Sequence, residues 1–267
     1  MQLEGCVSVI TGGANGIGLA VGLALARLRG SVVLADLDEG LLAAATAAVR
    51  AAGGTPLAVR CDVTRDEDVE HLASAALERF GHVDLVMANA GRPMGGRFEA
   101  ITTEDWKRLY DVNVFGVVRT IRAFLPHLSE RGRGRIVITS SSIALAPDNP
   151  FAAPYGSSKA ALVTLAQQLE LYVRRRGLGV TLLCPALTNT NFPRSVEVIG
   201  LPAPAPDEAS LARADTADDV AALLLDGLRH DRFLVAARAA DRPLLERRIR
   251  DLEETTALLF GDAASKG

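Results

Sequence analysis

Tyr155 and Lys159 are the two side chains whose types and spacing most clearly suggest chemistry. They are four residues apart in YGSSK, and this spacing places both side chains on one face of a helix. A phenol has a pKa of about 10 and is a poor base at neutral pH, but a neighbouring ammonium group favours the phenolate. The pair therefore predicts a tyrosine acid/base assisted by a lysine. A run of serines at 140–142, at the end of a predicted strand, supports this interpretation.

A glycine-rich segment near the start of the chain has the composition of a phosphate-binding turn. It reads TGGANGIG at 11–18 and lies between a strand-like run and a helical pattern. Gly12 permits a tight turn, Gly16 lets the backbone approach a pyrophosphate, and Gly18 lets the helix pack closely. The N–H groups at the start of the helix then face the anion. We expect a dinucleotide to bind there.

Asp36 predicts which dinucleotide is preferred. It ends the second predicted strand, 18 residues beyond Gly18, near the spacing of a carboxylate that binds the hydroxyls of adenosine ribose. Its charge would repel a 2′-phosphate, residue 37 is leucine, and no Lys or Arg occupies 13–15. The sequence therefore predicts NAD in preference to NADP.

The elements that position these residues alternate between strand and helix. Apolar runs predict strands at 5–10, 32–35, 57–61, 84–88, 135–139, 178–184 and 233–236. Helical patterns cover 17–29, 38–52, 65–80, 103–130 (with a possible break), 156–176, 217–229 and 242–258. Strands this continuously apolar are buried on both faces, which predicts an α/β fold, a doubly wound parallel sheet in a single domain over 1–267. Proline-rich residues at about 186–213 predict a substrate lid, and about 237–267 a C-terminal extension.

Composition excludes several classes of protein. Of the 267 residues 49% are hydrophobic and 23% charged, which excludes wholesale disorder, and the net charge of −3 argues against a primary nucleic-acid binder. We find no signal peptide and no run of 18 apolar residues. Cys6, Cys61 and Cys184 lack metal-ligand spacing. We expect a cytoplasmic protein with no metal and no membrane or nucleic-acid partner.

In chain order, these motifs resemble those of the classical short-chain dehydrogenase/reductase family over about residues 3–190. They are TGGANGIG at 11–18, Asp36, Cys61-Asp62-Val63, Asn89-Ala90-Gly91, Asn113, the serine run, Tyr155 with Lys159, and Pro185 to Thr190. The resemblance implies a Rossmann fold with helices on both faces of the sheet. It also implies a homodimer or homotetramer built through two of its helices.

The resemblance further implies roles for the matching residues. Tyr155 would exchange the carbinol proton, and Lys159 would bind the nicotinamide ribose and lower the pKa of the tyrosine. Asn113 would position the lysine and a proton-relay water. Ser142 lies 13 residues before Tyr155, the family's usual separation, so it is chosen over the two preceding serines to hold the substrate oxygen. The residues expected to bind the cofactor are Gly12, Asn15, Gly16, Ile17, Gly18, Asp36, Asp62, Val63, Asn89, Ala90, Gly91, Tyr155, Lys159, Pro185, Thr188 and Thr190.

We therefore expect an NAD-dependent oxidoreductase that interconverts a hydrophobic secondary alcohol and its ketone. The residues expected to face the substrate are all apolar: Met94, Ile143, Ala144, Phe151, Leu187 and Phe192. A phosphorylated or polycarboxylate substrate would need convergent arginines, and only Arg92, Arg97 and Arg194 are nearby. The predicted substrate is thus neutral and cyclic or aryl-substituted.

Three alternatives remain open at this point. The first is an NADP-dependent carbonyl reductase, and the second is a non-catalytic NAD-binding regulator or scaffold on the same fold. The third is an epimerase or dehydratase that retains its NAD. A complete Asn/Ser/Tyr/Lys set argues against the second, and the lack of a large C-terminal sugar domain argues against the third. Production of NADH from a secondary alcohol would separate the first hypothesis from the regulator.

Overall fold

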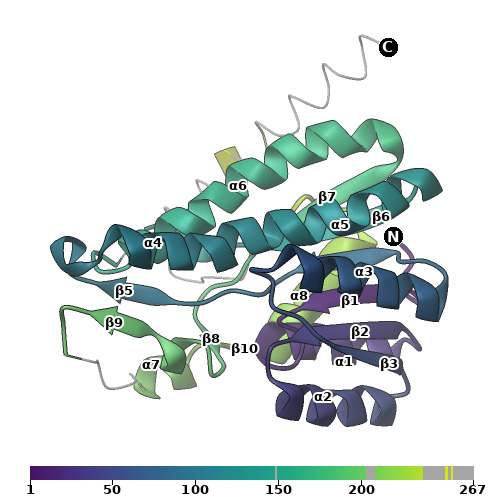
Figure 1. Cartoon of the computed structure of the whole chain (residues 1–267), viewed down its shortest axis with the longest axis horizontal. Helices are drawn as coiled ribbons and strands as arrows, with labels where there is room; N and C mark the ends of the chain where they lie inside the picture. The colour runs from purple at the N-terminus through teal and green to yellow at the C-terminus, as the bar shows by residue number, and fades with distance from the viewer. Residues whose placement is uncertain (148, 203–207, 237–249, 252–253, 255–267) are drawn as a thin grey trace.

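A seven-stranded parallel sheet forms the centre of the molecule (Figure 1). The computed structural model describes residues 1–147, 149–202, 208–236, 250–251 and 254. The strands follow the order β11-β7-β6-β4-β1-β2-β3, so the chain winds outward from β1 and then restarts beside it at β4. This order confirms the predicted doubly wound sheet. The strands are β1 (Val7–Thr11), β2 (Ser31–Asp36), β3 (Thr55–Arg60), β4 (Leu85–Ala88), β6 (Gly134–Thr139), β7 (Leu178–Cys184) and β11 (Leu234–Ala236).

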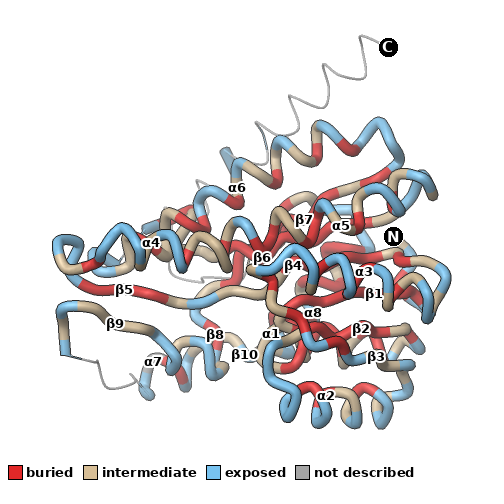
Figure 2. The backbone as a smooth tube through the Cα atoms, in the orientation of Figure 1, coloured by how far each residue is buried: buried red, intermediate tan, exposed pale blue. Residues whose placement is uncertain are grey.

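Helices cover both faces of this sheet. On one face α3 (Asp66–Phe80), α5 (Gly116–Arg131) and α6 (Ala153–Val173) bury Leu72, Phe124 and Leu162 against the strands. On the other face α1 (Gly16–Arg27), α2 (Glu39–Ala51) and α8 (Ala217–Arg229) bury Leu25, Leu42 and Leu224. The strands between them are almost entirely buried (Figure 2), which explains why their sequences are continuously apolar rather than alternating.

The helix predicted at 103–130 contains the break that its sequence suggests. α4 (Thr103–Tyr110) leads into a single π-helical segment (Asp111–Phe115), which continues into α5. A π-helical turn widens the helix by one residue and often marks a functional site. Asn113, which lies in the middle of this segment, is completely buried.

Two small sheets, which the sequence did not predict, tie the lid to the rest of the molecule. β5 (Met94–Gly96) pairs in parallel with β9 (Glu197–Ile199), and β8 (Thr188–Asn189) pairs with β10 (Asp215–Thr216). A short helix, α7 (Glu208–Ala212), also lies in the lid. Strands of two or three residues are too short to show a periodic pattern, so only the structure reveals them.

The predicted C-terminal helix at 242–258, like the extension at 237–267, falls almost entirely outside the described residues. Within the part of the chain that the structure describes, no helix combines the length and the apolar character needed to cross a bilayer. The same residues hold no cluster of His, Cys, Asp or Glu with the arrangement of a metal site.

Candidate active site

Tyr155 and Lys159 lie in the first turns of α6, beside the carboxyl end of β6. Lys159 Nζ donates a hydrogen bond of 3.0 Å to the carbonyl of Thr139, the last residue of that strand. The same nitrogen lies 5.9 Å from the centroid of the Tyr155 ring. The helix therefore brings the two groups to one face, at the edge of the sheet where a doubly wound fold binds its ligands.

The protonation of this pair differs from the expectation based on the sequence. Burial raises the pKa of Tyr155 to about 12, although a hydrogen bond with the Ser141 side chain acts in the opposite direction. Burial also lowers the pKa of the Lys159 ammonium to about 8. The expected lowering of the tyrosine pKa by Lys159 is thus absent, because desolvation outweighs it and Lys159 bonds to the Thr139 carbonyl. At neutral pH, Tyr155 is therefore a proton donor.

The serine in contact with Tyr155 is Ser141, whereas counting residues selects Ser142. Ser142 begins a short 3-10 helix and donates its backbone N–H to the Pro185 carbonyl. Ser140 is buried and donates its hydroxyl to the Lys159 carbonyl at 2.7 Å. Ser141 lies 14 residues before Tyr155, so the usual separation of 13 misses it by one position in the intervening loop. The geometry therefore favours Ser141 over Ser142 as the hydroxyl that faces the substrate oxygen.

Asn113 joins the loop after β4 to the start of α6. Its Oδ1 accepts from the Arg92 N–H at 2.8 Å, and its Nδ2 donates to the Arg92 carbonyl at 3.0 Å. The same Nδ2 donates to Ser158 Oγ at 3.0 Å, and Ser158 donates onward to the Tyr155 carbonyl at 2.7 Å. A Cβ added to Gly91 would lie 3.3 Å from both Asn113 Oδ1 and Lys159 Nζ. The π-helical turn thus places Asn113 where it fixes the backbone around the catalytic pair.

The glycine-rich segment forms the tight turn that its composition predicts. Gly16 has a φ of +54°, and Asn15 caps α1 by accepting the Gly16 N–H at 2.7 Å. A Cβ on Gly18 would lie 2.2 Å from the Gly12 carbonyl oxygen, so only glycine permits this approach of helix and turn. Asn89 donates from Nδ2 to the carbonyls of Thr11 and Gly12. The side chains of Asn15 and Asn89 therefore build the turn, and its amides remain directed at a ligand.

Two carboxylates flank this turn where the adenosine half of a dinucleotide would lie. Asp36 ends β2 and accepts from the Ala14 N–H at 3.2 Å, which places it beside the glycine turn. Asp62 follows β3, and its Oδ1 accepts both bonds that Thr64 donates. Asp62 Oδ2 is then suited to accept from an adenine amine, as predicted for Asp62 and its neighbour Val63. These positions fit a dinucleotide that presents ribose hydroxyls to Asp36.

The segment after β7 lies across the same turn. The Thr190 side chain would lie 3.6 Å from a Cβ on Gly16, so this residue stands over the N-terminus of α1. Thr188 is buried and donates its hydroxyl to the Ala186 carbonyl at 2.9 Å. The structure thus brings Pro185 to Thr190 into the position that the sequence predicts for the nicotinamide side of the cofactor.

Apolar side chains surround Tyr155 on the substrate side. Phe151, Leu187 and Phe192 are all exposed, and the Phe192 ring lies 5.9 Å from that of Tyr155. Ile143 lies against Gly156, one residue beyond Tyr155. Met94 is only 3% exposed and packs with Tyr155 in a small core, so it supports the site from below rather than facing solvent.

Comparison with known proteins agrees with this geometry. The model of the short chain dehydrogenase family matches residues 6–197. The chain belongs to the short-chain dehydrogenase family. A 1-deoxy-11-beta-hydroxypentalenate dehydrogenase of Streptomyces exfoliatus is 35% identical over 246 residues, covering 91% of this chain and 86% of the relative.

Solved structures of short-chain dehydrogenases share the fold. A short-chain dehydrogenase/reductase from Burkholderia phymatum, in complex with NAD, superposes with a TM-score of 0.83 at 34% identity and covers 96% of each chain. An alcohol dehydrogenase from Thermococcus sibiricus, complexed with 5-hydroxy-NADP, gives 0.77 at 28% identity, with 89% of this chain and 98% of that one covered. The short-chain dehydrogenase studied here is therefore an NAD(P)-dependent oxidoreductase that acts on CH–OH donors.

Proposed function

We propose that this enzyme uses NAD to interconvert a hydrophobic secondary alcohol and its ketone, with Tyr155 as the acid/base. The observation that carries the proposal is the contact of Tyr155 with Ser141 and Lys159 at the carboxyl edge of the sheet. A regulator that only binds the nucleotide would not need a buried tyrosine within reach of both a hydroxyl and an ammonium group.

The residues of the site divide the work. Bound NAD supplies the nicotinamide carbon that accepts the hydride. Tyr155 exchanges the proton of the substrate oxygen, and the Ser141 hydroxyl donates a hydrogen bond to the same oxygen as its charge develops. Lys159 holds a positive charge beside the ring and favours the phenolate that forms in reduction. Because burial raises the pKa of Tyr155 to about 12, ketone reduction should be favoured at neutral pH and alcohol oxidation should accelerate as the pH rises.

Three features support NAD rather than NADP. The Asp36 carboxylate lies beside the turn and would repel a 2′-phosphate. Leu37, the next residue, is exposed and offers no cation. The structure from Burkholderia phymatum was solved with NAD, although the one from Thermococcus sibiricus holds an NADP derivative, so relatives of this chain accept either cofactor.

The wall of the site supports an apolar, neutral substrate. Phe151, Leu187 and Phe192 expose apolar surface beside Tyr155, and burying it would contribute about 25 cal/mol per Å². Arg92 and Arg194, which could bind an anionic substrate, are already paired with Glu197 and Glu208. By its name, the relative from Streptomyces exfoliatus acts on the hydroxyl group of an organic acid, which makes a carboxylated alcohol the sharpest competitor in a substrate panel.

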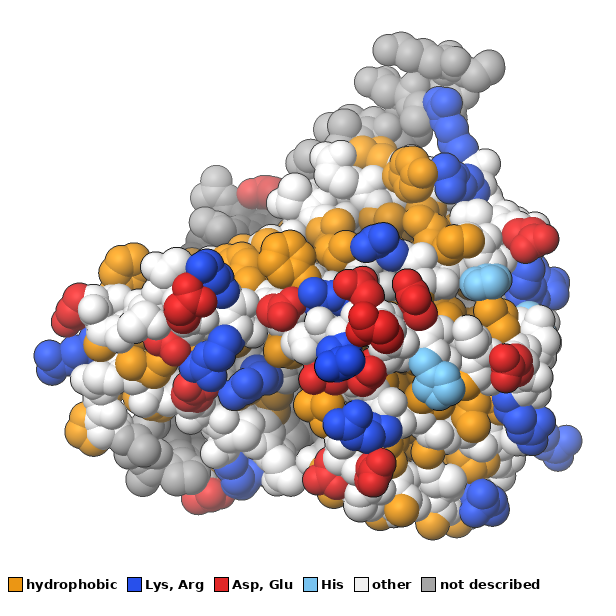
Figure 3. Space-filling view, in the orientation of Figure 1, with side chains coloured by type: hydrophobic (Ala, Val, Ile, Leu, Met, Phe, Trp, Pro, Cys, Tyr) orange, Lys and Arg blue, Asp and Glu red, His pale blue; other side chains and the backbone are white. Residues whose placement is uncertain are grey.

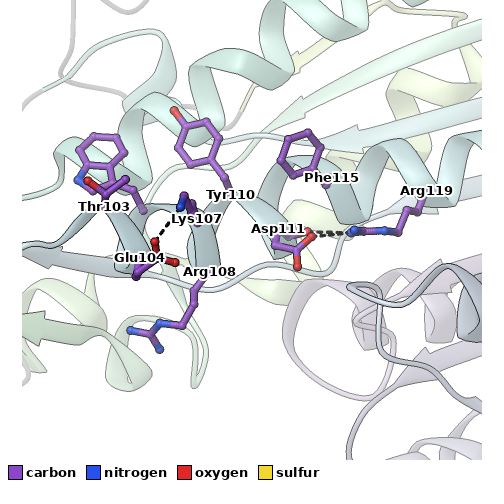
Figure 4. Close-up of a pocket in the computed structure, with 9 residues that line it drawn as sticks. Thr103, Glu104, Lys107, Arg108, Tyr110, Asp111, Phe115 and Arg119 are labelled. Atoms are coloured by element: carbon purple, nitrogen blue, oxygen red, sulfur yellow. Dashed lines mark hydrogen bonds and ion pairs between the residues drawn. The ribbon is translucent and has the colours of Figure 1, made fainter.

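An apolar outer face supports the proposed homodimer or homotetramer. Hydrophobic side chains gather over α4, α5 and α6 (Figure 3), where Phe98, Phe115 and Tyr172 are all more than half exposed. A shallow hollow over α4 and the π-helical segment is lined by aromatic residues, including Tyr110 and Phe115 (Figure 4). A second copy would remove this surface from water. We place the enzyme in the cytoplasm, since its cysteines are free and buried.

The decisive experiment measures NADH formation from NAD and a panel of cyclic and aryl secondary alcohols, their carboxylated analogues, polyols and sugar phosphates. Tyr155→Phe should abolish turnover while NAD titration still shows binding. Ser141→Ala should lower kcat by about 100-fold or more, whereas Ser142→Ala should retain activity within about threefold. NAD binding without turnover of any alcohol would refute the proposed reaction. An equal loss in the two serine variants would refute the assignment of Ser141.

A further inference from the structure

A single carboxylate of the lid lies between two arginines of the catalytic half of the molecule. Glu197 is the first residue of β9, and its side chain is one-third exposed. Its Oε2 lies 3.3 Å from Arg92 Nη2, and its Oε1 lies 2.9 Å from Arg108 Nη2. Arg92 belongs to the loop after β4, while Arg108 belongs to α4. Glu197 thus connects the lid to two separate elements.

The strand that begins at Glu197 lies next to the proposed substrate wall. β9 pairs with β5 in a register that aligns Glu197 with Met94, whose side chain packs with Tyr155. β5 also donates the Gly96 N–H to the Phe151 carbonyl at 2.8 Å. The lid, the loop before α6 and the core beneath Tyr155 therefore meet on one three-residue strand. Three residues of strand pairing form a weak attachment, so a side-chain contact at the end of β9 matters for its position.

Arg92 connects this attachment to the catalytic residues. Its backbone N–H and carbonyl are both bonded to the side chain of Asn113, while its guanidinium bonds to Glu197. Arg108 is held in turn by Asp105 at 2.7 Å, which orients it before Glu197 arrives. The close-up shows Arg108 pointing away from the hollow that Tyr110 and Phe115 line (Figure 4).

We propose that Glu197 is a positioning residue, which holds the lid on the substrate side of Tyr155 through Arg92 and Arg108 and so sets the affinity for the substrate. The inference rests on the proposed substrate site, but the contact itself does not depend on the identity of the alcohol. Exposed ion pairs are individually weak and are screened by salt. Loss of the contact should therefore raise KM for the alcohol by about three- to tenfold and leave kcat and the KM for NAD within about twofold.

The test compares Glu197→Gln with a matched control on the same face of the protein. Glu104 and Lys107 form an equally exposed ion pair on α4, at 2.7 Å, that does not reach the lid. Glu104→Gln should leave every kinetic constant unchanged. Arg92→Gln should reproduce the effect of Glu197→Gln without touching the backbone bonds to Asn113. The double variant should be no worse than either single one, because both remove the same contact.

Limited trypsin digestion provides a readout that needs no substrate. The lid contains Arg194, and cleavage after it should be several-fold faster in Glu197→Gln and Arg92→Gln than in Glu104→Gln. Unchanged cleavage and unchanged KM in both lid variants would overturn the proposal, as would a loss confined to kcat. Faster cleavage in a protein that oxidises no alcohol would instead refute the proposed function and leave the role of Glu197 in positioning the lid. If Glu197→Gln fails to fold, Arg92→Gln alone decides the question.

Discussion

Replacing Lys159 by methionine should abolish activity and make the protein more stable. Lys159 is 2% exposed, and burial lowers its pKa from 10.5 to about 8. Each pKa unit corresponds to about 1.4 kcal/mol, so holding the charged side chain costs the folded state about 3 kcal/mol at pH 7. Methionine removes this cost and keeps an apolar chain of similar length, but it loses the hydrogen bond to the Thr139 carbonyl, worth about 1 kcal/mol. The net gain should be about 2 kcal/mol, or about 5 °C in Tm.

The pH dependence of this gain identifies its cause. The folded-state pKa lies below the unfolded-state value, so the cost of the charge is complete below pH 8 and fades as the pH rises from 8 to 10.5. Unfolding in urea at pH 6.5 and 9.5, without NAD, should show the advantage of Lys159→Met shrinking by about 2 kcal/mol. Lys107→Met, at the exposed lysine of α4, should gain nothing at either pH. A Lys159→Met variant that is less stable than the wild type at pH 6.5, or whose advantage does not change with pH, would refute the reasoning.

Three further predictions follow from the turn, the buried acid of α6 and the end of β2. Gly18→Ala should weaken NAD binding at least tenfold and lower Tm, because a Cβ would lie 2.2 Å from a carbonyl oxygen of the turn; NAD titration and a thermal melt would measure both, and normal binding would contradict the close approach. Glu170→Gln should cost about 2 kcal/mol in urea unfolding with little change in kcat, because this 2% exposed carboxylate accepts the Val180 N–H. Asp36→Ala combined with Leu37→Arg should reverse the ratio of kcat/KM for NAD and NADP, and an unchanged ratio would remove Asp36 from cofactor selection.

The sequence by itself determined those features that depend on local spacing and on composition. Continuous apolar runs such as β1 and β4 are compatible only with burial on both faces, and this dictated a parallel sheet between two layers of helices. The spacing of Tyr155 and Lys159 fixed their common face, because helical geometry is the same wherever the helix lies. Gly18 was predictable for the same reason, since a tight turn before a helix requires it in any doubly wound fold.

The tertiary structure decided what depends on the path of loops and on the exclusion of water. Counting along the chain pointed to Ser142, but the loop before α6 places Ser141 against Tyr155. A lysine four residues away suggested a lowered pKa for the tyrosine, yet the surrounding core raises it, because desolvation depends on every element packed around the phenol. The pairing of β5 with β9, and the carboxylate of Glu197 between two arginines, join residues about 100 positions apart. Such contacts leave no periodic trace in the sequence, since strands of three residues are fixed by their neighbours in space rather than by their own pattern.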